Sequence, residues 1–292
     1  MRFLPKFSLL LALMVGLSLS GTALATATFT NQLNDQDMGN PSNWDQTLES
    51  GNNAQIDYAK FDDEVEPGIL GTGDTIICQK FRIGWTDSDT KMIIDGGTMN
   101  SGRGSKKKSF WIAENDASDT GHLEMLSGSI DHDQGHFWVG GEGHGTMLMT
   151  GGTIDVESNM ALAFQTTGVG ELTMEGGSII VGGDLEVARK GKGTFDMTGG
   201  SITAGSAFRM TDNSTAAGDM DLHGGTVEAL FLDIGTGVNG DPNDGFLDIA
   251  YDGKLILDGD ATDEIADLIA NGDITSLGTD QLTVTTDRTA GV

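Results

Sequence analysis

Residues 172–179 read LTMEGGSI, and variants of this segment recur along the chain. The other clear copies begin at Leu123, Met147, Phe195 and Met220, so that successive copies start 24, 25, 23 and 25 residues apart. A fixed period in this range is the signature of a solenoid, in which each repeat is one turn that contacts only its neighbours. The repeat therefore predicts one elongated domain.

Three short strands are expected in each repeat. The apolar residues alternate before the Gly-Gly pair, as in Leu172 and Met174, and again after it, as in Ile179 and Val181. Alternation with a period of two indicates strands with one apolar face. A third alternating pair recurs between the Gly-Gly turns, at Phe81/Ile83, Phe110/Ile112, Phe137/Val139, Met160/Leu162, Leu185/Val187, Phe208/Met210 and Leu232/Ile234. A coil of about 24 residues leaves no room for a crossover helix.

Stacked coils can bury an apolar face that a single coil cannot. We expect one interior ladder of Met125, Met149, Met174, Met197 and Leu222, and another of Ile130, Ile154, Ile179, Ile202 and Val227. The Gly pairs would supply the sharp turns. The predicted fold is all-β, a parallel β-helix solenoid, and right-handed is the default hand of parallel crossovers.

The chain divides into four predicted segments. Residues 1–25 have a basic start, an apolar stretch and an Ala23-Leu24-Ala25 cleavage motif, which predicts a signal peptide and a secreted or cell-surface protein. Residues 26–75 lack the repeat and are interpreted as an N-terminal cap, and residues 76–257 as the β-helix. Residues 258–292 are interpreted as a C-terminal cap, with a helix that starts at Asp260 and ends at Gly272 and a strand over 281–285. We expect no membrane span in the mature chain.

The composition restricts the partners. The formal net charge is −28, which repels nucleic acid, anionic membranes and, without a bridging divalent cation, polyanionic polysaccharides. Cys78 is the single cysteine, so no intramolecular disulfide can form. No nucleotide-binding loop or nucleophile-elbow motif is present.

The repeat resembles that of a known group of proteins. The pattern G-x-L-x-M-x-G-G-x-I, alternating with a short V-G or V-A strand, is similar to the β-strand repeats of secreted bacterial autotransporter-like and exosortase-sorted (PEP-CTERM-associated) proteins. Asn43-Trp44 resembles their N-terminal segment, and residues 255–260 resemble their closing unit. The resemblance implies an extracellular structural, adhesive or polysaccharide-associated role.

Trp111 and Trp138 occupy the same position in adjacent coils. Both are predicted to point outward, about 4.8 Å apart, where two indoles could form a platform for sugar rings. The alternative is that a loop or the N-terminal segment packs over them, because large exposed apolar patches are uncommon.

Two clusters are candidate metal sites. Asp131, His132 and His136 combine carboxylate and imidazole ligands, although their spacing matches no known zinc pattern and His132 falls in an inward column. Asp241, Asn243 and Asp244 offer oxygen ligands for weak calcium binding, and the alternative is an ordinary turn. Calcium is the one cofactor that the sequence suggests.

Asp131 and Asp155 are expected to be neighbours in one outward column. Adjacent carboxylates can supply the acid and base of polysaccharide cleavage, whereas solvated surface is the simpler interpretation. The first functional hypothesis is thus a non-catalytic structural or adhesion β-helix that binds a polysaccharide or cell-surface glycan. The alternative is a polysaccharide lyase or glycoside hydrolase, and a third hypothesis is end-to-end self-assembly.

Overall fold

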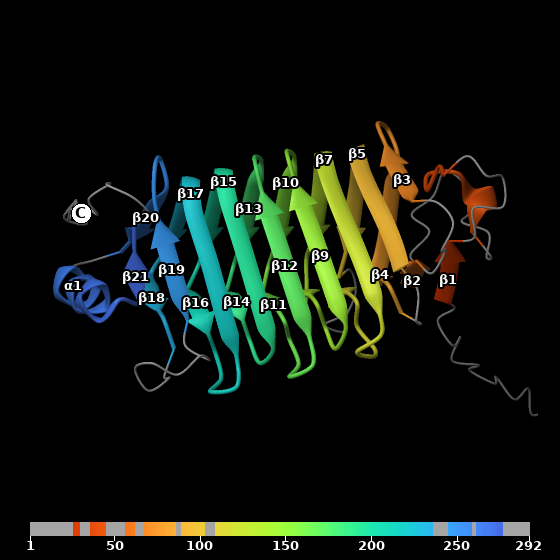
Figure 1. Cartoon of the computed structure of the whole chain (residues 1–292). Helices are drawn as coiled ribbons and strands as arrows, with labels where there is room; N and C mark the ends of the chain where they lie inside the picture. Colours follow the sequence, from red (N-terminus) through yellow and green to blue (C-terminus); the bar gives the residue numbers. More distant parts are fainter. Residues whose placement is uncertain are drawn as a thin grey trace, which may run out of the picture.

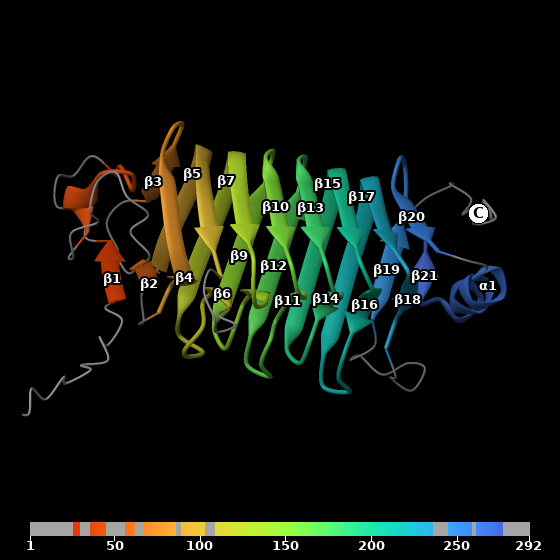
Figure 2. The same ribbon diagram turned by 180° about the vertical axis from the view of Figure 1, so that it is seen from behind.

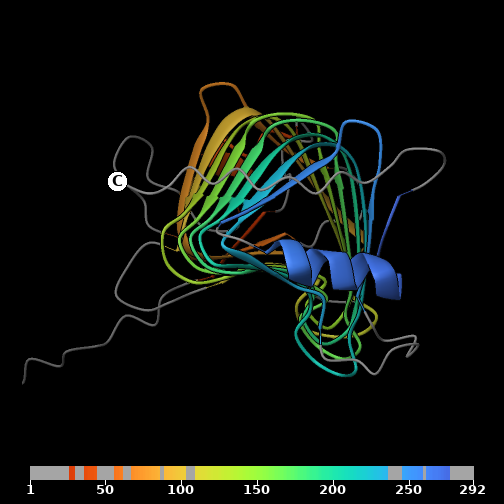
Figure 3. The same ribbon diagram turned by 90° about the vertical axis from the view of Figure 1, so that its left-hand side faces the viewer.

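The computed structural model describes residues 26–29, 36–44, 56–61, 67–85, 89–102, 109–235, 245–258 and 261–276. These residues form a parallel β-solenoid of about eight turns with one short helix near the C-terminus (Figures 1 and 2), which confirms the predicted fold class. The view along the stack in Figure 3 shows that the coils superimpose around a shared interior. The signal-peptide prediction falls on residues outside this set.

Each turn contributes strands to three faces. The first face, which carries the Leu-x-Met segment, contains β3 (Gly68–Gly71), β9 (His144–Met149), β12 (Val169–Met174), β19 (Phe246–Ile249) and β21 (Ile274–Thr275). The second face contains β10 (Thr153–Val156), β13 (Ser178–Val181) and β20 (Lys254–Leu257). In four turns the first two strands are continuous around the corner, as β5 (Asp89–Ser101), β7 (Thr120–His132), β15 (Lys192–Ala204) and β17 (Ala217–Ala229).

The third face carries the short strands between the Gly-Gly turns. It contains β1 (Thr26–Phe29), β2 (Ile56–Phe61), the end of β4 (Thr75–Ile83), β6 (Phe110–Ile112), β8 (Phe137–Val139), β11 (Met160–Leu162), β14 (Leu185–Ala188), β16 (Ala207–Thr211) and β18 (Phe231–Asp233). All of these pairings are parallel and join successive coils.

The predicted interior ladders are present. The methionines of β7, β9, β12 and β15 are in register from coil to coil, and the isoleucines of the second face form a second column. All of these side chains are buried. On the third face, the rings of Phe81, Phe110 and Phe137 stack with centroid separations of 5.2 and 4.4 Å. The interior is therefore a set of columns of like side chains.

The Gly-Gly corner and the methionine ladder depend on each other. Gly152, Gly177, Gly200 and Gly225 have φ between +78° and +89°, a region that disfavours any side chain. A Cβ on each of these glycines would lie 2.6–2.8 Å from the methyl carbon of a methionine in the preceding coil. Each methionine therefore extends beneath the corner of the next coil and occupies the space that the glycine leaves open.

The stacked strands begin earlier than predicted. The segment 26–75 was expected to be a cap without the repeat, but β1 pairs with β2, β2 with β4, and β3 with β5, all in parallel. The boundary at residue 76 is thus wrong, because strand pairing starts before the apolar pattern becomes regular. Trp44 closes this end, where its indole Nε1 donates a hydrogen bond to the carbonyl of Met38 at 3.0 Å. The 3-10 helix η1 (Pro41–Asn43) precedes it.

The helix α1 (Thr262–Asn271) lies at the C-terminal end of the stack (Figures 1 and 3). Its predicted apolar stripe of Ile265, Leu268 and Ile269 packs against the core, and Gly272 ends it in the left-handed conformation, as predicted. The helix begins after Ala261; Asp260 and the strand expected over 281–285 lie outside the described residues. Within the described residues, no helix has both the length and the apolar character needed to cross a lipid bilayer.

Candidate functional site

The outward side chains of the third face vary in size and charge from coil to coil. From coil to coil, one column in register reads Arg82, Trp111, Trp138, Ala161, Glu186, Arg209 and Asp233. The interior side of the same strands carries only apolar residues. Packing between the coils therefore does not require the sequence of the outward column, and this makes it the candidate functional surface.

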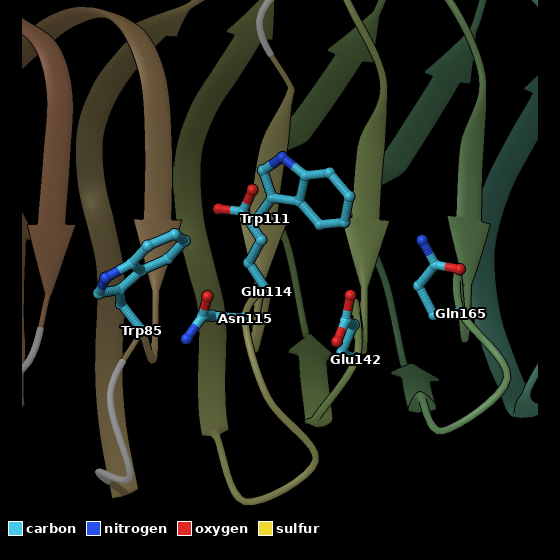
Figure 4. A pocket seen from close by; sticks show the side chains of 6 residues that line it. All are labelled: Trp85, Trp111, Glu114, Asn115, Glu142 and Gln165. Atoms are coloured by element: carbon cyan, nitrogen blue, oxygen red, sulfur yellow. The ribbon is translucent and has the colours of Figure 1, made fainter.

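A recess of about 150 Å³ opens at the N-terminal half of this face. Figure 4 shows Trp85 and Trp111 in the recess, with Glu114 beside Trp111, Asn115 and Glu142 below the indoles, and Gln165 on the far side from Trp85. The recess spans four coils, because its lining residues follow β4, β6, β8 and β11 in turn. The lining residues are Trp85, Trp111, Glu114, Asn115, Glu142 and Gln165.

Two basic side chains hold one wall of the recess in place. The Lys80 ammonium and the Arg82 guanidinium each form an ion pair with one oxygen of the Glu114 carboxylate. The Arg82 guanidinium carbon also lies 3.7 Å from the centroid of the Trp85 ring, and Lys80 Nζ lies 5.6 Å from the Trp111 ring. Cations at such distances from indole rings are attracted to them. Both indoles and the carboxylate are thus fixed before any ligand arrives.

The two tryptophans predicted to form a platform have different environments. They are in register, as expected, but their rings are 5.9 Å apart and inclined by 51°, so they do not form a flat surface. Trp138 is only 2% exposed, and the ring centroids of Phe164 and His136 lie 4.5 and 4.7 Å from its own. The next residue in the column, Ala161, is small. The predicted open platform is therefore absent at Trp138, where the alternative of a covering segment holds, whereas Trp111 lines the recess.

Farther along the same face lies a buried carboxylate. Glu186 is 2% exposed; its Oε1 accepts a hydrogen bond from the Asn159 amide at 3.3 Å, and its Oε2 lies 3.7 Å from Arg189 Nη1. Burial raises the pKa of Glu186 to about 7, and Arg189 opposes this rise. The Arg189 guanidinium also covers Trp138 and Phe164, at 5.3 and 5.2 Å. Glu186, Arg189, Trp138 and Phe164 thus form a packed cluster on the third face next to the recess.

Asp131 and Asp155 are neighbours in register on the second face, as predicted. With Asp133 and Glu157 they line a hollow of about 400 Å³. Asp131 is partly exposed and Asp155 exposed. Four carboxylates therefore line this hollow.

The structure does not assemble the predicted Asp131, His132 and His136 metal site. His132 is buried in the core, where its Nδ1 is 2.8 Å from the Ser101 hydroxyl and burial lowers its pKa to about 4. The ligand atoms of Asp131, His132 and His136 do not all lie within 4.8 Å of one another, and the His136 ring packs on Trp138 of the third face. The other metal prediction, calcium at Asp241, Asn243 and Asp244, falls outside the described residues.

The sequence patterns missed most of the recess. Trp85, Glu114 and Phe164 each come directly after the small residue that follows a third-face strand, namely Gly84, Ala113 and Ala163. These three small residues have positive φ, so the backbone turns there and projects the next side chain over the face. Alignment of the repeats at this small residue would have revealed the column.

Comparisons with known proteins add nothing to this geometry. No family model, no curated protein and no solved structure matches the chain. The functional interpretation therefore starts from the third face itself.

Proposed function

We propose that this protein is an extracellular, non-catalytic β-solenoid that binds a neutral polysaccharide at the recess between Trp85 and Trp111. The single observation that carries the proposal is the combination, in one recess, of two fixed indoles with carboxylate and amide groups. Indoles pack against the apolar faces of sugar rings. The oxygens of Glu114, Glu142 and Gln165 can accept hydrogen bonds from sugar hydroxyls.

Size and charge support an extended, neutral ligand. Pockets that enclose small molecules usually measure about 300–1,000 Å³, and this recess of about 150 Å³ is smaller. A recess of this size can contact one sugar unit of a polysaccharide that continues along the third face. A formal charge of −28 disfavours a polyanionic chain. The ion pairs of Glu114 already order its side chain, so binding would cost less side-chain conformational entropy.

Retention on a panel of neutral polysaccharides, measured by affinity electrophoresis, tests the proposal. We expect Trp85→Ala combined with Trp111→Ala to weaken binding at least about tenfold, because the stacking surface is removed. Glu142→Ala, at an exposed position, should also weaken binding and leave the melting temperature unchanged. The matched control is Phe231→Ala, an exposed aromatic residue on the same face outside the recess. Equal retention of all four proteins would contradict the proposal.

A second function, polysaccharide cleavage, is favoured by the hollow that Asp131, Asp133, Asp155 and Glu157 line. Stacked carboxylates are the groups that glycoside hydrolysis needs. An assay for reducing ends and unsaturated products over the same panel tests it. Cleavage that Asp131→Asn abolishes would establish an enzyme, and a panel without products would reject this second function.

A further inference from the structure

The C-terminal turns contain a mixed carboxylate and imidazole cluster on the first face. Asp221 lies on β17 and Asp248 on β19, where the two residues are partners in register, and His223 is two residues beyond Asp221 on the same strand. One ligand atom from each of the three side chains lies within 4.8 Å of the others. Among the described residues, this is the one group of three or more acidic, histidine or cysteine side chains that meets this criterion.

We propose that Asp221, His223 and Asp248 bind a divalent transition-metal ion, with Zn²⁺ as the probe, and that this ion ties the last turns of the solenoid together. The site is separate from the recess on the third face. It does not depend on the function proposed there.

The geometry of His223 and Asp248 supports the site. His223 Nε2 lies 3.0 Å from Asp248 Oδ2. Two ligands that lie about 2.0–2.2 Å from one zinc ion, with a ligand–zinc–ligand angle between about 90° and 110°, are about 2.8–3.6 Å apart. The two atoms therefore already have the separation of neighbouring ligands. Rotation of the partly exposed Asp221 side chain would bring the third ligand to the ion.

A hydroxyl of the next coil orients the buried ligand. Thr275 Oγ1, on β21, donates a hydrogen bond to Asp248 Oδ1 at 2.6 Å and leaves Oδ2 directed at His223. Asp248 is 1% exposed, so its carboxylate has little water to solvate it. Metal ligands are commonly held in this way by a hydrogen bond from a neighbouring residue.

The column also carries uncompensated negative charge. Asp196, Asp221 and Asp248 follow one another in register on β15, β17 and β19. Like charges at adjacent positions on neighbouring strands repel. Within the described part of the chain, no lysine or arginine forms an ion pair with any of these three carboxylates, and His223 is the basic group beside them. A bound cation would offset this repulsion.

The ligand set selects the class of metal. Two carboxylates and one imidazole suit Zn²⁺ and related ions, whereas Ca²⁺ and Mg²⁺ prefer oxygen ligands alone. Three protein ligands leave further coordination positions to water. Because Asp221, Asp248 and Thr275 lie on β17, β19 and β21, the ion would connect three successive strands of the first face.

Isothermal titration with ZnCl₂ and measurement of melting temperature, both on the full chain freed of metal by chelation, test the proposal. We expect saturable binding of one Zn²⁺ and a melting temperature that rises with Zn²⁺ concentration, because the ion binds only the folded state. His223→Gln and Asp221→Asn should each weaken Zn²⁺ binding at least about tenfold, and Thr275→Val about tenfold. Zn²⁺ should raise the melting temperature of these variants less.

The matched control is His144→Gln. His144 Nε2 also faces a carboxylate, Glu171 Oε1 at 3.1 Å, but this pair is not part of a three-residue group. We expect this variant to bind Zn²⁺ like the unaltered protein. Loss of binding in His144→Gln, retention of binding in both His223→Gln and Asp221→Asn, or stabilisation by Ca²⁺ without any by Zn²⁺ would each overturn the proposal. Should His223→Gln fail to fold, Asp221→Asn, at a partly exposed position, decides the outcome.

Discussion

In the interior of the solenoid each column keeps mainly apolar side chains from coil to coil, whereas the outward column of the third face mixes aromatic, small, acidic and basic residues. The same strands build both surfaces: Phe110 and Phe137 stack inside, and Trp111 and Trp138 lie outside them. The interior must fill a constant cross-section, and a change in one coil would leave a void beside its neighbours. The outer face has no such constraint. Variation in the outward column is therefore compatible with the fold and leaves this surface free to be adapted to binding.

The largest expected effect is on the interior. Phe137→Ala removes a ring stacked at 4.4 Å on Phe110 and should lower the free energy of unfolding by about 3–5 kcal/mol. Urea denaturation measures this value. Phe137→Leu, which restores most of the volume, should cost much less. A loss below about 1 kcal/mol for the alanine variant would show that the aromatic column does not support the stack.

Glu186 lies in the outward column of the third face but is buried. Its pKa is about 7 in the folded protein against 4.5 ordinarily, so the unfolded chain loses this proton at lower pH than the folded protein does. The free energy of unfolding should then fall as the pH rises from about 4.5 to about 7, by up to about 3 kcal/mol.

Unfolding measured across this range in Glu186→Gln should lack that decrease, because the amide does not titrate. The variant should be more stable than the unaltered protein at pH 8, and similar to it at pH 4. Asp155→Asn, which removes an exposed carboxylate of the second face, is the control. A Glu186→Gln protein that is less stable at pH 8 would contradict the prediction and show that the charged form is stabilised.

The corner between the first and second faces should give a smaller effect. Gly177→Ala places a Cβ at φ +89°, 2.6 Å from the Met149 methyl and 2.8 Å from the Gly152 carbonyl, and should cost about 2 kcal/mol or more. Gly73 has a similar φ of +94° but no heavy atom within 4 Å of the same position. Gly73→Ala should therefore cost only about 1 kcal/mol, the strain of the backbone alone. Equal losses by thermal denaturation would mean that contact with the methionine ladder contributes nothing.

The smallest effect is expected at an outward position of the second face. Ile180 is 41% exposed, in register with Asp155 and Thr203. Ile180→Thr should change the free energy of unfolding by no more than about 0.5 kcal/mol. A loss above about 1 kcal/mol would show that this face is covered by another part of the chain, and the simple division between inside and outside would then not hold there.

The sequence by itself determined the stack. The period near 24, the alternation of Leu172 with Met174 and the Gly-Gly pairs predicted parallel coils, interior methionines and glycine corners, and the structure confirms all three. Such features are local, and the solenoid repeats them with neighbours that have nearly the same sequence. Each contact is thus a copy of a pattern that is visible along the chain. The N-terminal boundary was missed because backbone pairing of β1, β2 and β3 does not need the regular side-chain pattern.

Only the tertiary structure decided which side chains meet on the outside. Alternation predicted that Trp138 points outward, but not that Phe164 from the next coil covers it. The pairing of Arg82 with Glu114 and the meeting of His223 with Asp248 likewise join residues 32 and 25 positions apart. The period places such residues in adjacent coils, but it does not say which of their side chains meet. These contacts arise because side chains from successive coils are brought within a few ångströms, where size and charge decide the arrangement.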